Sequence, residues 1–134
     1  MITFDNPRTV PAPGGPYSHV ATIPAGDSTL LFVAGQVAVD DTGALVGEGD
    51  MGEQTRVVME ILGGILAAHG ASFDDVVNIR SFVTDMDRLA EVAEVRRWYL
   101  SEPWPTSTSV EVSRLFLPGA LIEVEVVAAI SRRV

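Results

Sequence analysis

The hydrophobic pattern of this chain consists of short apolar runs, most of them bounded by glycine, proline or aspartate. Two such runs, over residues 18–23 and 29–34, flank Pro24-Ala25-Gly26-Asp27, so the sequence predicts two strands joined as a hairpin. Residues 1–14 contain three prolines and show no periodicity. We expect an extended lead-in there.

A helical spacing follows a second turn signal, Asp40-Asp41-Thr42-Gly43. Asp50 is placed to cap this helix, because Glu53 stands three residues later, as in a capping box. Gly70 predicts where the helix ends. The internal pair Gly63-Gly64 costs about 0.5–1 kcal/mol per glycine relative to alanine, and we interpret it as close packing of the helix on a sheet. The apolar stripe of the helix consists of Val57, Val58, Ile61, Leu62, Ile65 and Leu66.

The second half of the chain predicts three more strands and a second helix. Residues 76–83 are rich in β-branched and apolar residues, which is typical of a strand. Asp85 or Asp87 then caps a helix, and Pro103-Trp104-Pro105 ends it. The buried stripe of this helix is predicted to contain Leu89, Val92 and Val95. The last two strands are predicted over residues 107–113 and 121–130.

The predicted order is β-β-α-β-α-β-β. It indicates an α+β fold in which a single mixed sheet carries two helices on one face, as one domain over residues 1–134. The two strand–helix–strand crossovers favour parallel neighbours and right-handed connections. The last strand is apolar on both sides, since Ile122, Val124 and Val126 alternate with a set that includes Leu121 and Val127. Because the helices cover only one face, the other is predicted to be buried against a second subunit.

Charge and composition exclude several classes of function. The chain has 18 acidic and 9 basic residues, a net charge of −9, whereas nucleic-acid binding depends on basic side chains at phosphates. The only basic pairs are Arg96-Arg97 and Arg132-Arg133, so no nucleic-acid partner is predicted. Cysteine and lysine are absent, which excludes disulfides, thiolate metal sites and lysine Schiff bases. His19 and His69 are too far apart in sequence to indicate a metal site, and no cofactor is predicted.

No membrane partner is predicted either. No apolar run approaches the roughly 20 residues that span a bilayer. Residues 1–5 do not form a basic region followed by an apolar stretch, so a secretory signal is not expected. These features predict a cytoplasmic protein.

A set of short blocks, none of them specific alone, occurs in a fixed order. The blocks are Gly15-Pro16-Tyr17-Ser18, Gly35-Gln36, Gln54-Thr55 at the start of the long helix, Gly70-Ala71-Ser72, Val110 to Leu115, and Glu123-Val124-Glu125. In this order and spacing the chain resembles the Rid family (reactive-intermediate deaminases, also called YjgF-type proteins). The resemblance implies a YjgF-like (chorismate-mutase-like) fold and a homotrimer whose sheets form a central barrel. It also implies clefts between subunits that bind small metabolites.

The resemblance further implies a set of site residues. Tyr17 matches the family's cleft tyrosine, and Glu123 matches the cleft glutamate that orients or activates water, so these two are the candidate catalytic residues. Other interpretations are a half-buried core aromatic for Tyr17, and a solvated strand carboxylate or a partner of Arg114 for Glu123. The candidate ligand-binding residues are Tyr17, Ala34, Gly35, Ser107 and Glu123.

Ser107 is the main departure from the family pattern. In the deaminating members an arginine at this position holds the substrate carboxylate, because its guanidinium fork matches the two carboxylate oxygens. Serine offers one neutral donor instead. Ala34 also stands where many of those members have serine. Neither Arg80 nor Arg114 is an obvious substitute for the missing arginine.

Two hypotheses follow from this departure. The first is a Rid-type trimer that binds a small metabolite without the usual imine or enamine deaminase activity. The alternative is a deaminase or related hydrolase of imine or enamine C–N bonds, which uses Tyr17, Glu123 and a substitute anchor. Ser107 and Ala34 favour the first hypothesis.

Overall fold

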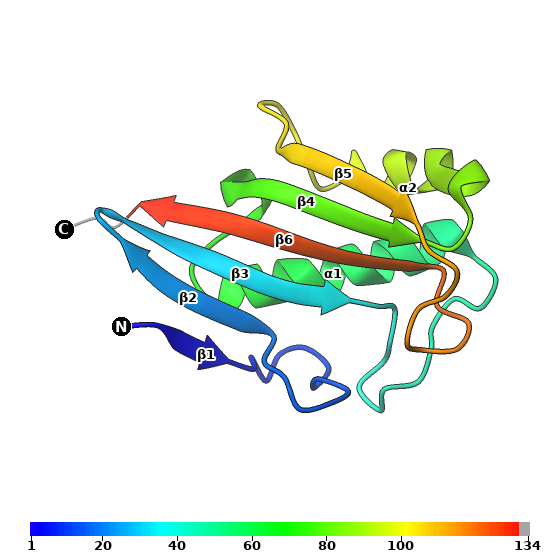
Figure 1. Cartoon of the computed structure of the whole chain (residues 1–134), viewed down its shortest axis with the longest axis horizontal. Helices are drawn as coiled ribbons and strands as arrows, with labels where there is room; N and C mark the ends of the chain where they lie inside the picture. Colours follow the sequence, from blue (N-terminus) through cyan, green and yellow to red (C-terminus); the bar gives the residue numbers. More distant parts are fainter. Residues whose placement is uncertain (132–134) are drawn as a thin grey trace.

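The computed structural model describes residues 1–131 and contains one six-stranded mixed sheet in the order β1-β2-β3-β6-β4-β5. Two α-helices, α1 (Met51–Ala68) and α2 (Leu89–Arg96), lie on the same face of this sheet (Figure 1). The predicted α+β architecture is therefore confirmed, and the basic pair Arg132-Arg133 lies outside the described residues. The strands are β1 (Thr3–Asp5), β2 (Val20–Ala25), β3 (Ser28–Gln36), β4 (Val76–Val83), β5 (Thr106–Glu111) and β6 (Ile122–Ser131).

Strand β1 replaces part of the extended lead-in that the sequence predicted. It pairs antiparallel with β2, with Phe4 opposite Ala21, and forms one edge of the sheet. A strand of three residues is too short to show alternation, so the pattern could not reveal it. A side-chain contact fastens this edge to the end of α1, since Nε2 of His69 lies 2.9 Å from Oδ2 of Asp5.

The predicted hairpin and the predicted turn after it are confirmed. β2 and β3 are joined through Gly26-Asp27, where Gly26 has a positive φ of 61°, while Pro24 lies within β2. In the following loop Oδ1 of Asp40 accepts hydrogen bonds from the backbone N–H groups of Thr42 and Ala44. This is the local Asx arrangement that makes aspartate a turn residue.

Helix α1 begins and ends where the sequence predicts. Oδ1 of Asp50 accepts the N–H of Glu53 at 3.0 Å, which satisfies one of the unpaired donors at the helix start. The Glu53 side chain pairs with Arg56 at 2.7 Å, and no bond from it to the Asp50 backbone completes the box. Gly70 follows the helix with a φ of 72°, a conformation that glycine adopts without a steric penalty.

The two glycines inside α1 allow close packing, but not on the sheet. A Cβ on Gly64 would lie 2.7 Å from Cγ1 of Val10, in the segment between β1 and β2. A Cβ on Gly63 would lie 3.1 Å from the ring of Phe73, in the 3-10 turn η1 (Phe73–Asp75). The helix therefore packs against a loop and a turn at these positions, and the prediction that the two glycines pack on the sheet was wrong.

The second helical segment is shorter than predicted. Asp85 caps a 3-10 turn, η2 (Met86–Arg88), by accepting the N–H of Asp87 at 3.0 Å, and α2 follows directly. α2 ends at Arg96, well before the prolines that were expected to end it. In the segment that follows, the N–H of Trp98 donates to Val95 at 3.0 Å in the i→i+3 pattern, while the N–H of Leu100 donates to Arg96 at 2.9 Å in the i→i+4 pattern.

The two crossovers place their strands differently. β4 and β5, joined by η2 and α2, are parallel neighbours as predicted. β3 and β4, joined through α1, run in the same direction but are separated by β6, which pairs antiparallel with both. The long last strand therefore lies at the centre of the sheet, and β5 forms the edge opposite β1.

The sheet has one covered face and one open face. The helix-facing side chains of β6 are buried, while Glu123, Glu125 and Val127 alternate with them on the face that no helix within residues 1–131 covers. Phe32 and Phe4 remain 45% and 68% exposed on this open face. No helix among residues 1–131 is long and apolar enough to cross a membrane. The buried side chains of β6 are Ile122, Val124, Val126 and Ala128.

Candidate functional site

The candidate site begins at an irregularity in β3. The register with β6 shifts between Val33 and Gln36, which places Ala34 and Gly35 in a bulge. The Glu123 side chain crosses directly over Gly35: a Cβ there would lie 2.8 Å from Cδ and 2.9 Å from Cγ of Glu123. Glycine is the residue that leaves room for this carboxylate to lie against the backbone.

A pocket of about 410 Å³ opens beside this bulge. Tyr17 and Phe116 form its aromatic walls and are 44% and 64% exposed, so Tyr17 is not part of the core. The Tyr17 hydroxyl oxygen accepts the backbone N–H of Gly14 at 3.3 Å, which holds the ring over its own loop. The pocket is lined by Gly14, Tyr17, Ser18, Ala34, Gly35, Phe116, Glu123 and Glu125.

A buried hydrogen-bond network holds the Tyr17 segment against the bulge. His19 is 2% exposed, and its Nε2 lies 2.7 Å from the carbonyl oxygen of Pro11. Nε2 of Gln36 lies 3.1 Å from Nδ1 of His19 and also donates to the carbonyl of Ala34 at 3.0 Å. These partners assign the neutral tautomer in which Nε2 carries the hydrogen and Nδ1 accepts. His19 therefore helps to position the segment that carries Tyr17 and does not itself line the pocket.

The environment of Glu123 favours its protonated form. Partial burial, and secondarily the nearby charge of Glu125, raises the pKa of Glu123. No ion pair joins Glu123 to Arg114 or to another basic residue in the part of the chain that the structure describes. Nor do the two glutamates form a metal site, because residues 1–131 contain no group of three or more metal-ligating side chains. A carboxyl with a raised pKa keeps its proton to higher pH, which is the property that a general acid needs.

Ser107 lies apart from the other four candidates. Its register partner on β4 is the fully buried Ile79, so Ser107 faces the helix side of the sheet. Glu123 pairs with Phe82 on β4 and faces the open side. One copy of the chain therefore brings Tyr17, Ala34, Gly35 and Glu123 together, and leaves Ser107 at a different surface.

Arg96 is a residue that the sequence reasoning missed. Its Nη2 donates to Oγ of Ser107 at 3.2 Å from the last turn of α2. Arg96 is partly buried, and this burial lowers the pKa of its guanidinium. A signal was available, because Arg96 lies four residues after Val92 and therefore next to the buried stripe of the helix.

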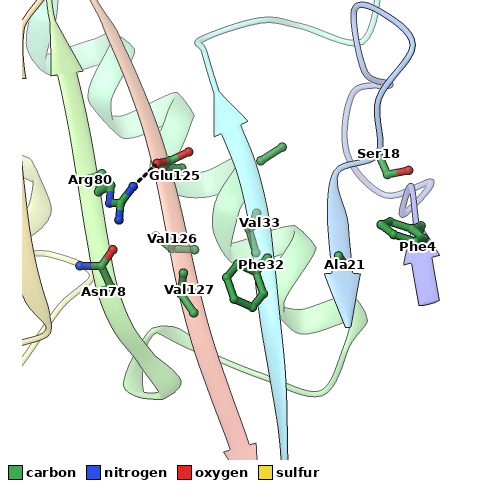
Figure 2. Close-up of a pocket in the computed structure, with 11 residues that line it drawn as sticks. Phe4, Ser18, Ala21, Phe32, Val33, Asn78, Arg80, Glu125, Val126 and Val127 are labelled. Atoms are coloured by element: carbon green, nitrogen blue, oxygen red, sulfur yellow. Dashed lines mark ion pairs between the residues drawn. The ribbon is translucent and has the colours of Figure 1, made fainter. Parts of the chain in front are cut away.

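Arg80 and Arg114, the two arginines considered from the sequence, lie elsewhere. Arg80 forms an ion pair with Glu125 at 3.5 Å on the open face, as Figure 2 shows. This pair borders a second hollow of about 520 Å³, whose other lining residues are uncharged. Arg114 is exposed in the segment between β5 and β6. The hollow follows a cross-strand row made of Phe4, Ala21, Phe32 and Val127.

The family follows from a comparison of the sequence. The profile of the family described as endoribonuclease L-PSP matches residues 8–130. The chain belongs to this family, the Rid or YjgF family. A RutC family protein of Pyrococcus horikoshii is similar to this Rid-family chain, with 41% identity over 121 residues that cover 90% of this chain and 92% of that protein.

Solved structures of other Rid proteins share the fold. The structure of RidA from the Antarctic bacterium Psychrobacter sp. has a TM-score of 0.78 at 31% identity and covers 90% of this chain and 94% of that one. The structure of Escherichia coli TdcF with bound serine has a TM-score of 0.81 at 27% identity and covers 96% of this chain and 99% of that one. The resemblance seen in the sequence blocks is therefore confirmed at the level of family and fold.

Proposed function

We propose that this Rid-family protein binds a small metabolite in clefts between the subunits of a homotrimer, without the imine and enamine deaminase activity of arginine-bearing members. The observation that carries the proposal is the pocket formed by Tyr17, Gly35 and Glu123, whose lining includes no arginine. Such a pocket combines apolar walls with a few convergent polar groups, as small-molecule sites do.

The cleft is proposed to be shared because two family site positions are separated within one copy. Glu123 faces the open side of the sheet, and Ser107 faces the helix side of the edge strand β5. A ligand that contacts both must therefore lie between two copies of the chain. The exposed apolar side chains of the open face, such as Phe32, supply a surface for that association.

The size of the pocket supports a small ligand. Its volume of about 410 Å³ is at the lower end of the range of about 300–1,000 Å³ for sites of small molecules and cofactors. The structure of TdcF with bound serine supports a ligand of amino-acid size in this family. Phe116 and Tyr17 would cover the apolar part of such a ligand, and Glu123 would contact its polar part.

The proposed loss of deamination rests on two positions. Hydrolysis of an imine derived from an amino acid needs the carboxylate held, the imine carbon presented to water, and the departing ammonia protonated. Ser107 replaces the arginine that would hold the carboxylate, and Ala34 removes a hydroxyl next to the pocket. A charge-assisted hydrogen bond stabilises by roughly 1.5–3 kcal/mol, so without an arginine at position 107 the substrate carboxylate is not held in the orientation that this arginine imposes.

A second candidate function is an imine or enamine hydrolase with a substitute anchor. The raised pKa of Glu123 favours it, because a carboxyl that exchanges its proton nearer neutral pH is a better general acid and base. The contact between Arg96 and Ser107 favours it as well, since it brings a guanidinium to the altered position.

An assay that generates 2-aminoacrylate in situ distinguishes the two functions, with keto-acid release as the readout. We expect release at the uncatalysed rate, with an arginine-bearing Rid protein as the positive control. A rate equal to the control contradicts the first proposal and supports the hydrolase. A metabolite screen by thermal shift then identifies the ligand, because a ligand at 100 times its Kd stabilises by about 2.7 kcal/mol.

The trimer is proposed to be cytoplasmic. Its proposed partners are other copies of the chain and a small metabolite, and nucleic acid is not among them. The net charge of −9 argues against nucleic-acid binding, although the description of the family profile is endoribonuclease L-PSP. RNA retention by the purified protein in a filter-binding assay would contradict the exclusion, and cell fractionation checks the compartment.

A further inference from the structure

Arg96 has no charged partner that would explain its position. The chain has twice as many acidic as basic residues, 18 against 9, yet no carboxylate lies within ion-pair distance of Arg96 in the described residues. The neighbouring Arg97 is more exposed and pairs with Glu94 at 3.5 Å. Burying a charge is costly unless the charge is paired. The position of Arg96 therefore calls for an anion that the single chain does not supply.

The donors of Arg96 are largely unused. Its one side-chain hydrogen bond within residues 1–131 runs from Nη2 to Oγ of Ser107 at 3.2 Å. A guanidinium has five N–H groups in a planar fork, and the Ser107 hydroxyl, which accepts from Arg96, keeps its own hydrogen to donate. Together the two side chains present several convergent donors and one positive charge.

We propose that Arg96 and Ser107 together bind the carboxylate of a small ligand, with the charge supplied from helix α2 instead of from strand β5. This inference rests on the proposed function, because it concerns the same intersubunit cleft. It assigns the class of ligand: a compact carboxylic acid whose other polar group contacts Glu123 of the neighbouring copy. The anchor is held at a different angle and reach from an arginine at position 107, which is consistent with binding without rapid deamination.

The charge of the site favours a carboxylate over a phosphate. The Arg96 guanidinium neutralises a single negative charge, and its N–H groups together with the Ser107 hydroxyl match the two oxygens of a carboxylate. A phosphate dianion would leave a charge uncompensated in a protein that is already at −9. Across the cleft, the Glu123 carboxyl, whose pKa is raised, can donate to a keto oxygen when protonated or accept from an N–H group when ionised.

Calorimetric titration with pyruvate and with its neutral counterpart pyruvamide tests the assignment. We expect wild type to bind pyruvate at millimolar concentration or below, and more tightly than pyruvamide. Arg96→Gln should weaken pyruvate binding about tenfold or more, equivalent to about 1.4 kcal/mol, and leave pyruvamide binding unchanged. Ser107→Ala should weaken pyruvate binding less, because it removes no charge.

Arg97→Gln is the matched control, since it removes the same charge from the adjacent position and should change neither affinity. Melting temperatures check folding, and a merely structural role of Arg96 would lower the melting temperature without changing the ratio of the two affinities. Unchanged pyruvate binding in Arg96→Gln, or no pyruvate binding by wild type, overturns the inference. If either of these results is found, pyruvamide binding that depends on Glu123 would still support the proposed cleft, so the two failures can be distinguished.

Mixed trimers test whether the two halves of the site come from different copies. Arg96→Gln and Glu123→Ala are each expected to bind pyruvate poorly, because each removes one of the two proposed polar contacts to the ligand. When the two variants are refolded together, some clefts combine an intact Arg96 with an intact Glu123 of the neighbour, so part of the pyruvate binding should return. No recovery in trimers shown to be mixed, while Arg96→Gln alone still loses affinity, places Arg96 outside the proposed shared cleft.

Discussion

At the scale of single residues, the candidate site is divided between the two faces of the sheet, since Glu123 faces the open side and Ser107 faces the helix side. Tyr17, Ala34, Gly35 and Glu123 were placed by their matches to family blocks, and the fold brings them to one pocket. Ser107 lies on the other face of the sheet, and its contact with Arg96 crosses from strand to helix. Such a contact depends on how α2 is docked, which no local pattern of residues encodes.

Gly35→Ala should weaken ligand binding by displacing Glu123. The added methyl group would overlap the carboxylate and lie within 2.9 Å of Cγ, so the side chain must move. Overpacking costs typically 1–3 kcal/mol, and we expect about 1 kcal/mol because the far end of a glutamate is flexible. Urea unfolding and ligand titration measure the two effects. Gly52→Ala is the control, since its nearest neighbouring atom is 3.7 Å away; equal behaviour of the two variants would show that the close approach at Gly35 has no consequence.

The raised pKa of Glu123 predicts a pH-dependent stability. The folded state binds this proton more tightly than the unfolded state, so stability is highest below the ordinary glutamate pKa and is lost as the pH rises through the folded value. Glu123→Gln should therefore raise the melting temperature at neutral pH, and the gain should vanish in acid. The exposed Glu48→Gln is the control and should change little at either pH. A gain that grows as the pH falls would reverse the sign and refute the assignment.

An arginine on β5 should be able to replace Arg96 of α2 as the proposed carboxylate-binding residue. Ser107→Arg alone places a second guanidinium next to Arg96, where like charges repel. In an Arg96→Gln background this repulsion is absent, and Ser107→Arg should restore pyruvate affinity by about tenfold, the equivalent of about 1.4 kcal/mol. Calorimetry of the single and double variants measures it. If the folded double variant binds no better than Arg96→Gln, position 107 does not face the ligand.

At the scale of elements, the strongly periodic or capped segments were predictable and the short ones were not. α1 carries an apolar stripe, a capping aspartate and a terminal glycine, and it was found with both ends. β1 has three residues and α2 has eight, so each is positioned by pairing or docking more than by its own pattern. The bulge in β3 is defined by its pairing with β6 and not by a local residue pattern, so the sequence did not predict it, although it creates the space for Glu123.

Asp50→Ala tests how much the local cap contributes to α1. The Asp50 carboxylate accepts the N–H of Glu53 at 3.0 Å, and loss of such a cap costs typically about 1 kcal/mol. Urea unfolding at fixed protein concentration measures the change. Asp41→Ala, at an exposed loop position, is the control and should stay within about 0.5 kcal/mol of wild type. Equal stability of the two variants would mean that tertiary packing alone fixes the helix start.

At the scale of the whole molecule, the open face of the sheet connects the fold with the proposed cleft. The sequence indicated a strand with apolar residues on both sides, and the structure shows that helices cover only one side (Figure 1). The row from Phe4 through Phe32 to Val127 leaves apolar side chains exposed in a single copy. Amphipathic patterning thus predicts that a face is covered, while the number and arrangement of the covering copies depend on shape at a scale beyond one chain.

The last prediction concerns this assembly. We expect sedimentation equilibrium to give three times the chain mass of 14.3 kDa at micromolar concentration. Phe32→Glu should dissociate the trimer, because it places a charge in the centre of the apolar row, next to Val127. The dissociated chain should stay folded by circular dichroism and lose pyruvate binding, since each cleft needs two copies. Ala67→Glu, which adds the same charge on the exposed side of α1, should remain a trimer and bind pyruvate normally. A wild-type monomer would refute both the trimer and the shared cleft, whereas a Phe32→Glu monomer that still binds pyruvate would place the whole site within one chain.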